Sequence, residues 1–407
     1  MTVETLPQHS QPATAHSEGL GRRQVHAVAA CYFVASFAAL GLPPYLTAIL
    51  PGLGDPQARW AGILYIVPTV FSGLGAPLWG RLADRFGRKR LLLRAQLGLT
   101  VSFLLAGAAD SLPAFTLALV LQGFLGGTFA ATNGYLAAAL DGSRLSRALT
   151  LMQGSARAAL VAAPILVGAL SPWIDPHRQY LVMAVLPLAA AVLLSLLPEP
   201  ACPEAPEATA GRASGKAASA PLLTLYAFEF VFVFATVISF PYLIALAEQR
   251  LPGVDGTTTG VLFALPHLCY LVFAARTHRL FDSRPHTGIA IGFGFVALGL
   301  AGHAVAYSLP VFIAVRLLLG GGLTLGLVCL AVLAAGAAKG RPPGRMFGTL
   351  ELVSKGGAVA AGAVAALANG RFGAAAPVVA GTAAALLAAV AATALTLPSL
   401  RQRWSRR

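Results

Sequence analysis

The apolar residues of the chain are gathered in long runs, which short polar or basic segments separate. A run of about 18 to 25 apolar residues is long enough, as a helix, to cross the hydrocarbon core of a bilayer. Twelve such runs predict twelve transmembrane helices, at 24–46, 60–80, 91–108, 113–139, 148–170, 178–197, 222–246, 258–276, 287–306, 311–337, 346–368 and 374–397. The pattern therefore predicts an all-α membrane protein whose termini lie on the same side.

Composition agrees with this interpretation, because 57% of the residues are hydrophobic and only 11% are charged, a balance too apolar for a soluble globular protein. A net charge of +14 would suit nucleic-acid binding, but the basic residues instead follow the positive-inside rule. With both termini in the cytoplasm, the Lys and Arg residues outside the cytoplasmic tails and loops are few: Arg59, Arg178, Arg250 and Arg371 on the opposite side, and Arg157, Arg316 and Lys355 within helices. We expect an inner-membrane protein with cytoplasmic termini and no nucleic-acid partner.

The two parts of the chain repeat one another at an offset of 197 or 198 residues. The matches follow the same order around the same predicted helices: Pro44-Tyr45-Leu46 with Pro241-Tyr242-Leu243, Gly62 with Gly260, Ser111-Leu112-Pro113 with Ser308-Leu309-Pro310, and Arg157 with Lys355. Two parallel six-helix repeats describe a known transporter architecture with its substrate site between the halves. We expect a six-helix half over 1–197, a cytoplasmic linker rich in Pro, Ala and Glu over 198–220, and a second six-helix half over 221–407.

A basic motif joins the second and third predicted helices. Its sequence is Gly80-Arg81-Leu82-Ala83-Asp84-Arg85-Phe86-Gly87-Arg88-Lys89-Arg90, which resembles the signature loop of the major facilitator superfamily at every characteristic position. The resemblance implies a twelve-helix facilitator fold over the whole chain. It also implies that Asp84 meets the N-terminal end of the eleventh helix, where the helix dipole favours an anion, and latches the cytoplasmic face shut. The expected latch residues are Gly80, Asp84, Arg85, Gly87 and Arg88; the counterpart around Asp282 lacks both glycines and should be weaker.

A closer resemblance to drug–proton antiporters is incomplete. In those proteins an Arg precedes Gln-Gly by three residues in the fourth helix, whereas this chain has Leu119 before Gln122-Gly123. The equivalent repeat position in the tenth helix holds Arg316, followed by three glycines. The cation of the antiporter motif is thus present in the second half of this chain. Gln122 and Arg316 are therefore candidate site residues.

Five ionisable residues lie within predicted helices: Arg157, Glu229, Arg316, Glu351 and Lys355. A charge at the bilayer centre costs on the order of 2.5–3.5 kcal/mol on insertion scales and usually has a function. Arg157 and Lys355 lie at similar depth, about 14 Å from the cytoplasmic side at 1.5 Å per residue, and face each other as repeat mates. Glu351 precedes Lys355 by four residues and could simply neutralise it. Arg157 has no acid in its own helix and must find an anion elsewhere, in the protein or in the substrate.

Glu229 is the lone acid of the seventh helix, and its repeat mate in the first helix is Tyr32. We expect Phe228, Phe230 and Phe232 to desolvate its carboxylate, which suits a group that binds and releases protons. The alternative is a structural ion pair with one of the central cations.

Arg316 and His267 have ordinary alternatives to a site role. Arg316 lies about six residues from the non-cytoplasmic end of its helix and could snorkel to the interface. His267 follows Pro266 and is a candidate proton relay, although a lone His in an apolar helix is more often a packing residue.

No GxxxxGK[ST] phosphate loop occurs in the chain, so an ion gradient must drive transport. We predict a monomeric, cofactor-free and metal-free transporter of a small molecule, coupled to protons through Glu229 or Glu351. The central cations favour an anionic substrate, and the combination resembles exporters of citrate-type siderophores and drug-efflux proteins. A proton symporter importing organic acids or sugars, and a non-transporting sensor of the same fold, are alternatives. A membrane enzyme is disfavoured because the eight histidines are scattered.

Overall fold

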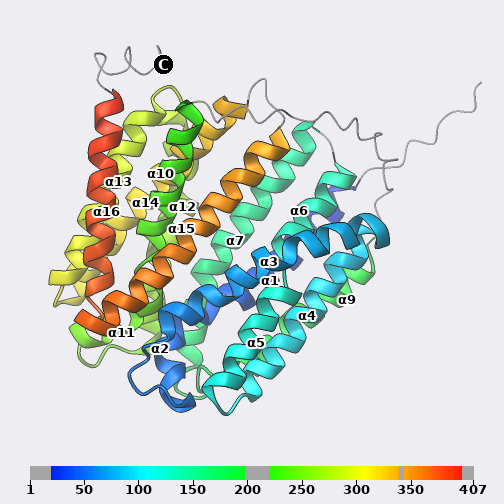
Figure 1. Cartoon of the computed structure of the whole chain (residues 1–407), viewed down its shortest axis with the longest axis horizontal. Coiled ribbons are helices and arrows are strands. Elements are labelled where there is room, and N and C mark those ends of the chain that lie inside the picture. The colour runs from blue at the N-terminus through cyan, green and yellow to red at the C-terminus, as the bar shows by residue number, and fades with distance from the viewer. Residues whose placement is uncertain (1–19, 141, 198–219, 339–342, 397–407) are drawn as a thin grey trace, which may run out of the picture.

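In the computed structural model, which describes residues 20–140, 142–197, 220–338 and 343–396, these residues form helices joined by short loops, with no strand among them (Figure 1). The first group of helices comprises α1 (Arg22–Gly41), α2 (Leu46–Ile49), α3 (Ala61–Phe86), α4 (Arg88–Ala108), α5 (Leu112–Leu125), α6 (Thr128–Ala139), α7 (Gly142–Leu170), α8 (Gln179–Met183) and α9 (Val185–Ser195). The second group comprises α10 (Ala220–Val237), α11 (Leu243–Arg250), α12 (Gly256–Phe281), α13 (Pro285–Val305), α14 (Leu309–Ala338), α15 (Pro343–Phe372) and α16 (Ala376–Thr396).

The all-helical membrane fold is confirmed. Nine helical segments of the described residues are long and apolar enough to cross a membrane. Three shorter apolar helices occupy the remaining predicted positions: Ala61–Ala76, Leu112–Leu125 and Gln179–Ser195. Six predicted spans thus precede residues 198–219, which lie outside the described residues and were predicted to be a linker, and six follow them.

Four predicted spans are broken rather than continuous. The first and seventh each end in a Pro-Tyr turn, η1 (Pro43–Tyr45) and η3 (Phe240–Tyr242), followed by the short helices α2 and α11. Proline ends each helix there because it lacks the N–H group that the helix needs. The fourth span is divided into α5 and α6, and the sixth into α8 and α9.

The break between α5 and α6 is held by side chains from two other helices. Gly127 has a φ of +82°, a conformation that glycine adopts readily. The carbonyl groups left free by the break accept hydrogen bonds: Trp79 of α3 donates to Phe124 O at 2.6 Å, and Arg94 of α4 donates to Leu125 O at 2.6 Å. The Arg94 guanidinium also lies 3.5 Å from the centre of the Trp79 ring. These bonds satisfy main-chain groups that a bilayer could not.

The two groups of helices meet at the end of the bundle that carries α2 and α11, here called the α2–α11 end. One hydrophobic core there contains residues of both groups, such as Leu42 and Leu46 with Tyr242 and Ala361. In three further cores, the buried residues come from a single group each. In Figure 1, α3 and α15 lie together near α2 and separate towards their other ends, at the end of the bundle where α10 begins. We call that opposite end the linker end.

Two tyrosines at matching positions of the predicted repeat join the groups at the α2–α11 end. The Tyr45 hydroxyl donates to Pro164 O of α7 at 2.6 Å and is hydrogen-bonded to Thr259 of α12. The Tyr242 hydroxyl accepts a hydrogen bond from Gly62 N of α3 at 3.1 Å and is hydrogen-bonded to Asn369 of α15. Each hydroxyl therefore contacts one helix of its own group and one of the other group.

Glycines allow the helices of the two groups to approach closely beside these tyrosines. A Cβ atom at Gly62 would clash with the carbonyl of Gly362, and one at Gly260 would clash with the carbonyl of Pro164. These two contacts are images of one another at the repeat offset of 198 residues. Small residues are typical where transmembrane helices pack closely, so the α2–α11 end is the closed end of the bundle.

Candidate functional site

Ionisable and polar side chains from five helices of both groups meet near the middle of the bundle. They come from α1, α7, α10, α12 and α15, each from near the middle of its helix. We call them the central cluster: Tyr32, Arg157, Glu229, Tyr270, Glu351, Ser354 and Lys355. The structure thus brings together five of the side chains that the sequence proposed for substrate binding or proton coupling, and adds Tyr270 and Ser354.

Glu229 lies between the charges of both groups. Its carboxylate accepts a hydrogen bond from the Ser354 hydroxyl of α15 and lies within electrostatic reach of Glu351 and Arg157. When a carboxylate lies near a second acid and a cation and is partly shielded from water, its protonation state is sensitive to small changes in its surroundings. The arrangement can therefore couple the charge of Glu229 to whatever occupies the space beside it.

Arg157 forms no ion pair with a carboxylate among the described residues. Its guanidinium carbon lies 5.5 Å from the centre of the Tyr270 ring, within the range of a cation–π interaction. Tyr32 and Glu229 are also within electrostatic reach. Because Arg157 has no carboxylate in direct contact in the described part of the chain, its hydrogen-bond donors are available for an anion.

Lys355 and Glu351 form the ion pair that their spacing suggested. The Lys355 Nζ atom lies 3.5 Å from Glu351 Oε1, and the side chains are 35% and 67% exposed. An exposed pair of this kind contributes only about 0–1 kcal/mol. Glu351 is also within electrostatic reach of Tyr32 in α1, so its exposed side faces the first group of helices and water reaches the cluster.

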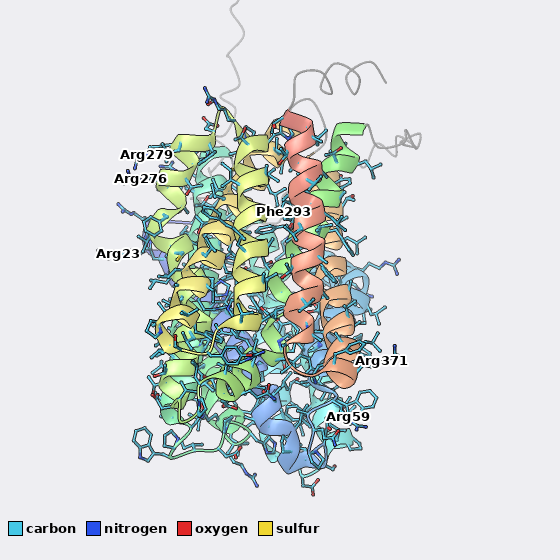
Figure 2. All side chains as sticks on the ribbon, turned by 90° about the vertical axis from the view of Figure 1, so that its left-hand side faces the viewer. Arg23, Arg59, Arg276, Arg279, Phe293 and Arg371 are labelled. Carbon is cyan, nitrogen blue, oxygen red and sulfur yellow. The ribbon has the colours of Figure 1, made fainter. Side chains whose placement is uncertain are left out.

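The Glu229 carboxylate is partly shielded from water, as expected, but not by a shell of all three neighbouring phenylalanines. Phe228 and Phe232 pack in the core of the second group, with ring centroids 5.9 Å and 6.0 Å from that of Phe293, which Figure 2 labels. Phe230 instead lies near Gly356 and Gly357 of α15, and it is 38% exposed. Neighbouring residues of a helix point in different directions, so proximity in sequence does not place all three rings beside the carboxylate.

Comparison with known proteins assigns the chain to a family. A sequence profile described as Major Facilitator Superfamily matches residues 28–283. The chain belongs to this superfamily. It is therefore a multi-pass membrane protein from a superfamily of transporters, not of enzymes.

Two relatives of this facilitator are proteins called multidrug resistance protein MdtG. The protein of Serratia proteamaculans (strain 568) is 34% identical over 157 residues, which are 38% of this chain and 36% of the relative. The protein of Klebsiella pneumoniae (strain 342) is 29% identical over 250 residues, 59% of this chain and 60% of the relative. The matched part thus spans less than two thirds of either relative.

Solved structures share the fold over nearly the whole chain. A POT family transporter in complex with 5-aminolevulinic acid has a TM-score of 0.74 at 12% identity, covering 92% of this chain and 96% of that one. The human organic anion transporter MFSD10 (TETRAN) has a TM-score of 0.66 at 19% identity, covering 91% and 99%. At these identities the likeness shows the fold alone.

Arg316 of this facilitator does not snorkel to the surface. Its side chain is fully buried, and its Nε donates to Leu262 O at 2.6 Å while Nη2 donates to Phe263 O at 2.8 Å. Leu262 is four residues before Pro266, which has no N–H group to bond its carbonyl. Arg316 therefore supplies the donor that Pro266 removes from α12.

Replacing Arg316 with alanine should lower the stability of the transporter by about 1–3 kcal/mol, because a buried carbonyl loses its partner. The loss should be smaller when Pro266 is also replaced with alanine, since the new amide can bond Leu262 O within the helix. Thermal unfolding of the four proteins of this double-mutant cycle measures the difference. Equal losses with and without Pro266→Ala would show that Arg316 does not serve that carbonyl.

His267 and Gln122 lie apart from the hydrogen bonds of the central cluster. His267 is buried between Phe240 and Phe263, with ring centroids 5.8 Å and 6.0 Å away, and neither ring nitrogen has a hydrogen-bond partner among the described residues. Arg157 is within electrostatic reach of the ring. Gln122 is buried in α5, and its side-chain oxygen likewise has no partner within the described part of the chain. Neither residue has a defined chemical role in the structure.

The latch motif spans the end of α3 and the start of α4. Gly87, with a φ of +92°, forms the turn between them, and Arg88 begins α4. The Arg85 guanidinium lies 5.3 Å from the centre of the Phe86 ring. The side-chain environments of Gly80 and Asp84 lie outside the described residues, so the expected contact of Asp84 with the eleventh span stays a prediction.

Tyr270 and Ser354 are the site residues that sequence reasoning missed. Both are uncharged, so a search for ionisable residues in apolar helices passes over them. Ser354 could have been found from its spacing, because it lies three residues after Glu351 and shares its helix face. Tyr270 reaches Arg157 from another helix, which no local pattern indicates.

Proposed function

We propose that this facilitator is a proton-coupled exporter of small anionic molecules or drugs, including siderophore-like chelates. Protons enter in exchange for substrate, which moves outwards by alternating access. The linker end faces the cytoplasm of a cell with an inner membrane, and the protein works as a monomer. The Asp84 latch closes the linker end in the conformation in which the α2–α11 end is open.

The central cluster is the observation that carries this proposal. Arg157 and Lys355 come from different groups of helices and supply positive charge, while Glu229 supplies a carboxylate that can carry a proton. An anion bound by Arg157 would lie within electrostatic reach of Glu229, so substrate and proton would affect each other's binding. Such mutual influence is what coupling requires.

The contrast between the two ends supports alternating access. Tyr45 and Tyr242 join the groups at the α2–α11 end, whereas Glu351 is exposed near the middle of the bundle. A site closed on one side and accessible from the other is one of the two states that alternating access needs. Figure 2 places Arg276 and Arg279 towards the top and Arg59 and Arg371 towards the bottom. This separation agrees with a cytoplasmic linker end.

Export is favoured over import by the relatives, because multidrug resistance is conferred by removal of a compound. Symport of an organic acid would use the same cations and carboxylates and is the second candidate. The direction in which protons move relative to substrate separates the two.

Purified transporter in proteoliposomes with an internal pH indicator tests the proposal. An imposed gradient of a citrate-type chelate or of a lipophilic drug should drive protons in the direction opposite to the substrate. Protons that move with the substrate would establish symport and overturn export by exchange. Absence of proton movement during substrate flux would overturn proton coupling.

Arg157→Ala tests the anionic preference in the same assay. Loss of a charge-assisted hydrogen bond of about 1.5–3 kcal/mol should weaken binding of the anion about 10- to 150-fold. Arg371→Ala removes an exposed cation at the α2–α11 end (Figure 2) and serves as the charge-matched control. Equal affinity of wild type and Arg157→Ala would contradict the anionic assignment.

A further inference from the structure

A hollow of about 440 Å³ lies on the surface of α4, against the end of α5. It is distinct from the central cluster. Two cations and four apolar side chains line it: Arg90, Arg94, Leu93, Leu97, Val101 and Leu125. Leu97 and Val101 are 49% and 48% exposed and belong to a segment apolar enough to span a membrane. In a membrane transporter such a surface is covered by lipid.

The hollow has the length of one bilayer leaflet. From Arg90 to Val101 it follows α4 for about 16 Å, at 1.5 Å per residue. Half of the hydrocarbon core of a bilayer is about 15 Å. Arg90 lies near the first residue of α4, at the linker end, and the leucines and Val101 lie deeper. A lipid of that leaflet would therefore have its headgroup beside the cations and an acyl chain along the apolar residues.

The cations of the hollow are not neutralised by an acid within the described residues. Arg90 is exposed and forms no ion pair there. Arg94 is fixed by its hydrogen bond to Leu125 O and by the Trp79 ring, so its charge is held in place at no further cost in side-chain entropy. Fixed positive charge above an apolar groove is complementary to a phosphate group above an acyl chain.

We propose that this hollow is a binding site for an anionic glycerophospholipid from the leaflet at the linker end. The apolar lining selects a lipid over a soluble phosphate, and the two cations select an anionic headgroup over a zwitterionic one. The bound lipid lies against the break between α5 and α6, which Arg94 stabilises. The site is independent of the direction and coupling of transport.

Native mass spectrometry of the detergent-purified full chain tests the site, with phosphatidylglycerol and phosphatidylcholine as probes. Wild type should retain phosphatidylglycerol preferentially, and soluble glycerol 3-phosphate should not displace it. Arg90→Ala should weaken retention about fivefold, the effect of one cation near a membrane surface. Leu97→Trp should also weaken it, because the indole fills the hollow and leaves both cations in place.

Arg276→Ala is the matched control, since Arg276 is an exposed cation towards the linker end (Figure 2) and lies in α12, which does not line the hollow. It should leave retention of phosphatidylglycerol unchanged. Equal retention of the two lipids by wild type would overturn the proposal, as would wild-type retention by both Arg90→Ala and Leu97→Trp. Substitution of Arg94 is avoided because it would also disturb the α5–α6 break.

Discussion

Replacing Glu229 with glutamine is expected to reduce substrate-driven proton movement in proteoliposomes to background while downhill exchange of substrate continues. The amide can still accept a hydrogen bond from Ser354 but cannot take up or release a proton. Transport that must be driven by the proton gradient should therefore stop, whereas exchange of labelled for unlabelled substrate should persist. Both fluxes are measured on the same vesicles, so loss of folding and loss of coupling are distinguished.

Glu248→Gln provides the control for this substitution, because Glu248 is an exposed acid at the α2–α11 end. It should preserve both fluxes. If Glu229→Gln continues to move protons with substrate, Glu229 is not the coupling group. Loss of proton movement in Glu351→Gln would then transfer the role to the other acid of the cluster.

Replacing Gly168 with valine should prevent the α2–α11 end from closing and should abolish transport. A Cβ atom at this position would overlap the carbonyl oxygen of Gly256 in α12 and would also meet the Tyr45 hydroxyl. Overpacking typically costs about 1–3 kcal/mol, enough to shift a conformational equilibrium about 5- to 150-fold away from the closed end. Spin labels at the exposed residues Gln57 and Gln249, one in each group, report this opening as a longer distance.

The control for Gly168→Val is Gly154→Val in the same helix. An added Cβ at Gly154 meets no other atom nearby, so the label distance at the α2–α11 end should match that of wild type. An unchanged distance in Gly168→Val would show that the glycine contact between α7 and α12 does not hold this end closed.

The number and order of the spans were predictable because each must be apolar along its whole length. The breaks within them were not. The Gly126-Gly127 pair permits a break in the fourth span, but the break persists because Trp79 and Arg94 satisfy the freed carbonyls from other helices. Those partners are distant in sequence, and an apolar run alone does not reveal them.

The charged part of the central cluster was predictable for a similar reason, because a charge in an apolar helix is costly and stands out. The direction of each side chain was not, as the three phenylalanines around Glu229 illustrate. The buried position of Arg316 was also missed, since its distance from the helix end indicated snorkelling. Its actual partner is a carbonyl group that Pro266 leaves without an amide donor. Arg316 and Pro266 lie in different helices, so this contact can be predicted only when two helices are considered together.

The paired tyrosine contacts bear on how such a transporter can be redesigned. Tyr45 and Tyr242 occupy equivalent repeat positions and close the bundle in equivalent ways, whereas the equivalent positions in the middle differ, with Glu229 opposite Tyr32 and Lys355 opposite Arg157. If the proposed function holds, cargo recognition and mechanical closure rest on separate residues of the same predicted spans. An engineer can vary the central side chains to obtain a new cargo and leave the closing machinery untouched.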